Sequence, residues 1–227
     1  MLIIRLFSAA MCDSVDHPRK LPEGLAGTLL LKSVFAGSFA LIACFAAPVF
    51  AQSSSIELSE KTRYYKISGT TAAEFAASMS RNGPYSREHR RRAWATATRD
   101  MTYQLFHRKG KKSCRIKGVK LKLKVTYEMP ELKSTNGVPK RQRNKWNTMY
   151  ILLNKHERTH GVYYSQFAKQ VYSSLLKLKP ATSCRSLERN ASQLVAKMGE
   201  ADKKRNQAFD VRDRGNYRSM ERLYSGS

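Results

Sequence analysis

Acidic residues are scarce in this chain. It has 17 Asp and Glu against 42 Lys and Arg in 227 residues, so its formal net charge is +25. A charge of that size bears on solubility and on partners, but it does not indicate a fold. Repeats and low-complexity tracts are lacking after residue 51, and that part of the chain is long enough to form one domain with a proper core.

Long apolar runs are also scarce, and the one marked run, residues 33–51, is short and rich in Ala, Ser and Gly. Arg19, Lys20 and Lys32 precede this run, and Val49 and Ala51 are small residues at its end. This layout is typical of a secretory signal, whereas a membrane span needs a longer apolar stretch. We expect residues 1–51 to be a signal peptide with an atypical N-terminal extension. A signal anchor is the alternative. The mature chain is expected in the periplasm or outside the cell, without a membrane span.

Cysteine is scarce as well, with four in the chain. Cys12 and Cys44 fall within the predicted signal peptide, which leaves Cys114 and Cys184 in the mature chain. In an oxidising compartment two remaining cysteines most simply form one disulfide. Two unrelated thiols are the alternative.

The hydrophobic pattern predicts an α+β fold, a small antiparallel sheet packed on a long helix and a C-terminal helix. Residues 119–127 alternate apolar side chains with lysines, which is typical of a strand with one buried face. We expect this strand to pair with a preceding strand within 94–106. The remaining predicted segments are loose residues 52–61, a strand at 63–68, a helix at 71–81 opened by a capping box, helices at about 143–179 and 184–208, and a polar, frayed tail from about 213.

The long predicted helix contains the sequence HERTH, an HExxH motif formed by His156, Glu157 and His160. Residues four apart lie above one another on a helix, so both imidazoles can reach one metal ion. The glutamate beside the first histidine can then take a proton from a water activated by Zn²⁺. All three polar residues fall on the apolar face of the helix, where unpaired polar groups are costly. A zinc site is one explanation, and a pair of hydrogen-bonded core histidines is the other.

A third metal ligand is not evident from the motif. Gln166 stands where the metzincin pattern HExxHxxGxxH requires its third histidine, which excludes that pattern. The remaining candidate ligands are Glu188 and Glu200 of the predicted C-terminal helix, or instead Asp202 or Asp210. We take Asp210 as the expected third ligand.

The order of segments resembles a bacterial family, the DUF922 family of predicted secreted zinc-dependent proteases. The matching pieces are YYKISG at 64–69, MSRNGP at 79–84, Trp94, Cys114, Trp146 and LLNKHERTHG at 152–161. The resemblance implies a single zincin-like domain over residues 52–227 and peptide or protein substrates. The family continues with a Tyr-Asp segment and a nearby His-Gly, where this chain has Phe209-Asp210 and then Gly215 without a histidine between them.

Two functions are therefore open. The first is a metallopeptidase in which Glu157 is the general base and Zn²⁺ is held by His156, His160 and Asp210. The second is a non-catalytic envelope protein with a degenerate HExxH, whose basic surface binds an anionic polymer through charge. Nothing in the sequence resembles a nucleic-acid-binding module, and a signal peptide makes intracellular nucleic acid an unexpected partner.

Overall fold

A long β-hairpin forms the centre of the sheet. The computed structural model describes residues 5–6, 54–86 and 91–224. Strand β5 (Thr96–Lys109) pairs antiparallel with β6 (Cys114–Leu132), with one irregularity between Phe106 and His107. Along β6 every second residue from Val119 to Tyr127 is buried, and the lysines between them are exposed. The predicted strand and its antiparallel partner are thus confirmed.

The sheet is mixed rather than wholly antiparallel, because its other long strand runs parallel to β6. This is β2 (Ser55–Ile67), which pairs with β6 from Ser55–Lys120 to Ile67–Leu132. The expectation of loose residues over 52–61 was therefore wrong from Ser55 onward. Those residues are polar because β2 is an edge strand, and its backbone is ordered by hydrogen bonds to β6 rather than by a buried apolar face. A two-residue strand, β1 (Arg5–Leu6), pairs in parallel with Thr98 and Arg99 of β5.

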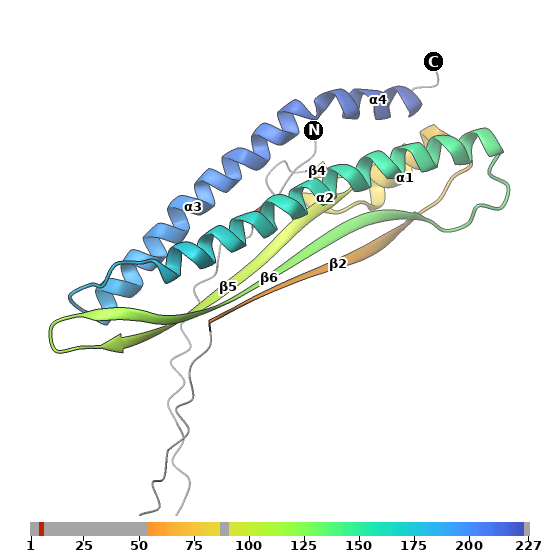
Figure 1. Ribbon diagram of the computed structural model, residues 1–227. Helices are drawn as coiled ribbons and strands as arrows, with labels where there is room; N and C mark the ends of the chain where they lie inside the picture. The colour runs from red at the N-terminus through yellow and green to blue at the C-terminus, as the bar shows by residue number, and fades with distance from the viewer. Residues whose placement is uncertain (1–4, 7–53, 87–90, 225–227) are drawn as a thin grey trace, which may run out of the picture. The chain divides into compact units, whose positions relative to one another are not determined.

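Two long helices follow the sheet in sequence, α2 (Lys140–Leu176) and α3 (Cys184–Arg212). Figure 1 shows α2 lying along one face of the sheet and α3 running beside α2. Met149, Leu153 and Tyr164 of α2 are fully buried and join the apolar face of β6 in one core. The predicted α+β class, with a small sheet packed on the helix that carries the motif and on a C-terminal helix, is confirmed.

The shorter elements complete the described unit. Helix α1 (Ala72–Asn82) begins at the predicted capping box, in which the Thr71 hydroxyl accepts from the backbone of Glu74 and the Glu74 side chain accepts from the backbone of Thr71. Strands β3 (Tyr85–Ser86) and β4 (Arg91–Arg92) form a separate antiparallel pair. The expectation of a frayed tail from about residue 213 was wrong, because α4 (Arg214–Tyr224) continues the chain as a helix.

Two predictions concern the export and the location of the chain. The predicted signal peptide, residues 1–51, lies outside the described residues except for Arg5 and Leu6. Cys114 and Cys184 are joined by a disulfide, with their Cα atoms 5.0 Å apart. No helix in the described ranges has both the length and the apolar character that crossing a bilayer requires.

Candidate metal centre

Glycine at position 161 allows the motif-bearing part of α2 to lie close to the sheet. A Cβ atom on Gly161 would lie 1.8 Å from the Tyr127 hydroxyl oxygen, and Tyr127 is itself a fully buried residue of β6. Any side chain at 161 would therefore push the helix and the strand apart. Because His160 directly precedes Gly161, this close packing also sets the depth at which the histidines lie.

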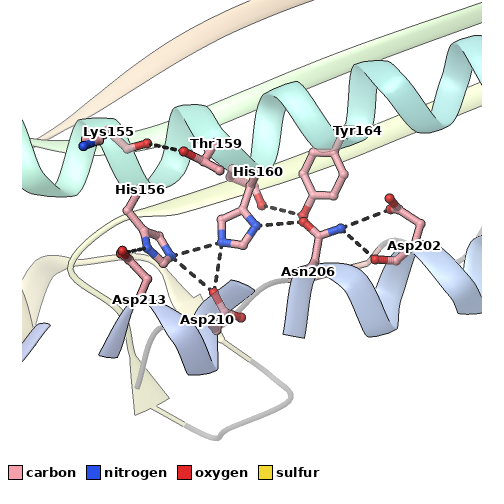
Figure 2. A network of polar contacts seen from close by, with 10 residues as sticks. Lys155, His156, Thr159, His160, Tyr164, Asp202, Asn206, Asp210 and Asp213 are labelled. Carbon is pink, nitrogen blue, oxygen red and sulfur yellow. Dashed lines mark hydrogen bonds and ion pairs between the residues drawn. The ribbon is translucent and has the colours of Figure 1, made fainter. Parts of the chain in front are cut away.

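Three ligand atoms of the predicted site converge between α2 and α3 (Figure 2). The Nε2 atoms of His156 and His160 are 3.0 Å apart, and the Asp210 Oδ1 atom lies 3.2 Å from the first and 3.0 Å from the second. Both histidines are buried, whereas the Asp210 side chain is 20% exposed. For comparison, ligand atoms about 2.05 Å from a tetrahedral zinc ion are roughly 3.3 Å apart. The spacing of the three atoms fits one small metal ion.

The other ring nitrogen of each histidine has a hydrogen-bond acceptor opposite it. His156 Nδ1 lies 2.6 Å from Asp213 Oδ2, and His160 Nδ1 lies 2.8 Å from Asn206 Oδ1. The Asn206 amide nitrogen donates to the Asp202 carbonyl and carboxylate, so its oxygen is the atom that faces His160. Both Nδ1 atoms must therefore carry a proton and donate it.

The consequence is that three lone pairs face one another. If each Nδ1 carries the proton of a neutral imidazole, each Nε2 is an acceptor, and Asp210 contributes a third acceptor. Three acceptors within about 3 Å of one another repel unless a cation, either a proton or a metal ion, lies between them. Two neutral imidazoles and a carboxylate, each imidazole oriented by a hydrogen bond through its second nitrogen, are the usual donor set and surroundings of zinc. The residues present thus fit the metal that the motif implies.

Electrostatics at Asp210 agree with this arrangement. Burial on its own would raise the pKa of the Asp210 carboxyl, but the adjacent His156 and His160 side chains outweigh burial, and the net pKa is lowered. Asp210 is therefore ionised at neutral pH, which is the form that binds a cation.

Glu157 occupies a different environment from the three ligand residues. Its side chain is 1% exposed, and its Oε1 atom has no hydrogen-bond partner among the described residues. Its pKa is raised to about 8, chiefly by burial and also by the charge of Asp210, while His160 and the Ala97 backbone act in the opposite direction. A buried carboxyl oxygen without a partner beside a cluster of metal ligands is suited to exchanging a proton there.

A chain of polar contacts supports the cluster from α3 into the sheet. The Asp202 carboxylate forms an ion pair with the buried Arg99 of β5 and a second one, 2.6 Å long, with Arg205. The Arg99 guanidinium lies over the Phe167 ring, 4.1 Å from its centroid.

Two further residues of α3 fix the positions of the histidines. Asn206 donates a hydrogen bond to Asp202 and faces His160 with its amide oxygen, which orients the His160 ring. Phe209 fills the space beside the ligands, with its ring stacked on His156 at 4.8 Å.

The structure brings together some of the residues proposed from sequence and separates others. His156, His160 and Asp210 meet at one place, and Glu157 is buried within the electrostatic influence of His160 and Asp210. Asp202 is engaged by two arginines instead. Glu188 pairs instead with His107 at 3.0 Å, and Glu200 is exposed.

Sequence reasoning missed Asn206 and Asp213. A recognisable signal exists, because Asp202, Asn206 and Asp210 are spaced by four and Asp213 follows by three, which places all of them on one face of a helix.

This arrangement defines the chain as an α+β protein with a two-histidine, one-aspartate cluster between two helices. Its sequence matches, over residues 62–216, the family described as bacterial protein of unknown function (DUF922), and the chain belongs to that family. No curated protein matches the chain, and no solved structure does.

Proposed function

We propose that this protein is an exported zinc-dependent metallopeptidase. The observation that carries the proposal is the convergence of His156 Nε2, His160 Nε2 and Asp210 Oδ1 within 3.2 Å of one another. These residues would hold the ion. Zinc, when bound, supplies a Lewis acid that polarises a substrate carbonyl and makes water a usable nucleophile near neutral pH.

The residues of the chain divide the remaining tasks. Glu157 would accept the proton of the attacking water and deliver it to the leaving amine, since its Oε1 atom is free of other partners in the described structure. Asn206 and Asp213 would hold the imidazole rings in one tautomer and one orientation. A substrate would approach from the side of Asp210 and Asp213, whose side chains are 20% and 17% exposed, because the histidines themselves are buried.

Deep burial of both histidines supports a second reading, in which the metal only joins α2 to α3 and no reaction occurs. The same arrangement of ligands would then be structural, as in zinc sites that are closed to water. Substitution of Glu157 separates the two readings because Glu157 is not among the converging ligands.

The decisive experiment compares the wild-type protein with Glu157→Gln, using labelled casein and a mixed peptide library read by mass spectrometry. A metallopeptidase should keep its zinc in the variant and lose roughly 100-fold or more of its hydrolysis. If zinc-loaded wild-type protein cleaves nothing in either assay, or if the variant cleaves equally well, the catalytic proposal fails and the structural reading stands. Zinc content measured on both samples shows that the comparison concerns the reaction rather than metal loss.

A further inference from the structure

One end of the described unit carries a dense group of exposed cations, far from the candidate metal centre. The β5–β6 turn and the α2–α3 connection lie at this end (Figure 1). They are joined there by the Cys114–Cys184 disulfide and by backbone pairing of Cys114 with Ala181. Along α3, Cys184 and Asp210 are separated by about 40 Å at the rise of an α-helix.

We define the basic tip as the cationic residues of these two segments. All of them are exposed: Arg108, Lys109, Lys111, Lys112, Arg115, Lys117, Lys177, Lys179, Arg185 and Arg189. In the described structure none of them forms an ion pair with a carboxylate. The one acidic residue of the segments, Glu188, pairs with His107 instead. The tip is thus a patch of uncompensated positive charge that the disulfide holds in one place.

The composition of the tip restricts the kind of partner. Residues 107–117 and 177–189 contain no Phe, Tyr or Trp, so the tip lacks the stacking surfaces with which proteins bind single-stranded nucleic acid. Large apolar side chains are also few, with Leu176 at 40% exposure beside the tip. Clustered lysines and arginines without an apolar face are typical of adsorption to anionic headgroups by charge.

The direction in which the chain enters the fold points to the same partner. The apolar run 33–51 ends shortly before β2, and this run either crosses a membrane during export or stays in one. The first residue of β2, Ser55, pairs with Lys120, which lies nearer to the Cys114 end of β6 than to its Leu132 end. The strand that follows this predicted signal therefore begins in the half of the sheet that carries the basic tip.

We propose that the basic tip docks the protein on the anionic lipid headgroups of a membrane surface. Docking at this end leaves the candidate metal centre, at the other end of α3, pointing away from the lipid. The inference does not depend on zinc or on hydrolysis, so it stands or falls separately from the proposed function.

Co-sedimentation of the purified protein with lipid vesicles tests this proposal. The vesicles are made of phosphatidylcholine alone, or contain about one quarter phosphatidylglycerol, in roughly 0.1 M salt, where the screening length is about 10 Å. The tip variant carries Lys109→Glu, Lys111→Glu and Lys112→Glu. The control carries Lys133→Glu, Lys140→Glu and Arg141→Glu, the same change of charge at exposed positions near the far end of β6 and the start of α2.

The wild-type protein should sediment with the anionic vesicles and not with the neutral ones. Each basic residue lost near the membrane surface reduces partitioning of the protein onto anionic vesicles roughly fivefold. The tip variant should therefore bind these vesicles about 100-fold more weakly than wild type, and the control should stay within about tenfold of wild type. Circular dichroism melts of all three proteins show whether they are folded. A Lys→Gln version of the tip variant replaces the Glu version if that one unfolds.

Several results would overturn the proposal. Equal losses in the tip variant and the control would mean that only net charge matters. Binding of wild type to neutral vesicles, or to no vesicles, would exclude anionic headgroups as the partner. Tip-dependent binding to soluble polyphosphate but not to vesicles would assign the tip to a soluble polyanion.

Discussion

The two ends of α3 are held to the rest of the protein by different means. In the N-terminal half the buried residues are the apolar Leu187 and Ala191, and a disulfide joins Cys184 to the hairpin. In the C-terminal half the buried residues are the polar Asp202 and Asn206, which contact Arg99 of β5 through an ion pair and His160 of α2 through a hydrogen bond. Burial of apolar groups stabilises the folded state without a specific partner, whereas a buried polar group requires a hydrogen-bond or ion-pair partner.

This difference indicates why the candidate metal site lies where it does. The histidines of α2 face the polar half of α3, where a cation would complete a set of otherwise repelling acceptors. The basic tip belongs to the other half, where the charged side chains remain in water and need no partner for folding. Each half can therefore be altered separately, and the predictions below use that separation.

The largest effect on stability is expected at the disulfide end. The Cys114–Cys184 disulfide closes a loop over a sequence separation of 70 residues and so restricts the unfolded chain. Cys184→Ser opens this loop, and the chain-entropy relation gives a loss of roughly 4 kcal/mol in the free energy of unfolding. Urea denaturation of the variant and the wild type measures this loss. Zinc content should not change, because the metal ligands lie at the other end of α3. Loss of zinc together with the disulfide would mean that the two ends are not independent.

A smaller loss is expected where α2 packs on the sheet. Gly161→Ala places a methyl group against the buried Tyr127 hydroxyl, so we expect the free energy of unfolding to fall by about 2 kcal/mol. Gly199→Ala on α3 is the matched control, since a Cβ atom there has no neighbour within 4 Å.

The control should gain up to about 1 kcal/mol from helix propensity. Thermal or urea unfolding of both variants tests the pair. A loss of similar size in both would contradict the role assigned to the close approach at Gly161.

The smallest effect is expected at the hydrogen bond that orients His156. Asp213→Ala removes the acceptor of His156 Nδ1 without removing a proposed ligand, so zinc affinity should fall by roughly 10- to 100-fold while one ion can still bind. Competition with a chromophoric chelator measures this change. Asp100→Ala, an exposed aspartate on β5, serves as the control and should leave affinity unchanged. Unchanged affinity in Asp213→Ala would remove Asp213 from the site.

The features that could be predicted from sequence are those determined by local pattern. The alternation from Val119 to Tyr127 indicated β6, Thr71 and Glu74 indicated the start of α1, and the HExxH spacing placed His156 and His160 on one face of α2. Each of these depends on residues a few positions apart, whose relation is set by helix or strand geometry alone.

The features that could not be predicted depend on contacts between distant segments. Ser55 to Thr62 carry no clear apolar alternation, and they form a strand only because β6 supplies hydrogen bonds. α4 was missed because residues 214–224 are mostly polar. The spacing of Asn206 and Asp213 places them on one face of a helix with Asp210, but their roles follow only from the way this face lies against α2. Asp210 was one of four candidate carboxylates for the third ligand, and only the packing of the two helices brings it to the histidines.

Metal analysis of the purified protein by mass spectrometry, beside His160→Ala, tests the central claim most directly. We predict close to one zinc ion per chain in the wild type and none in the variant, because His160 contributes one of the three converging atoms. Wild-type protein that holds no zinc after incubation with the metal, or a variant that holds as much as wild type, would contradict the account. In either case a shared proton, and not a metal ion, would have to occupy the space between His156, His160 and Asp210.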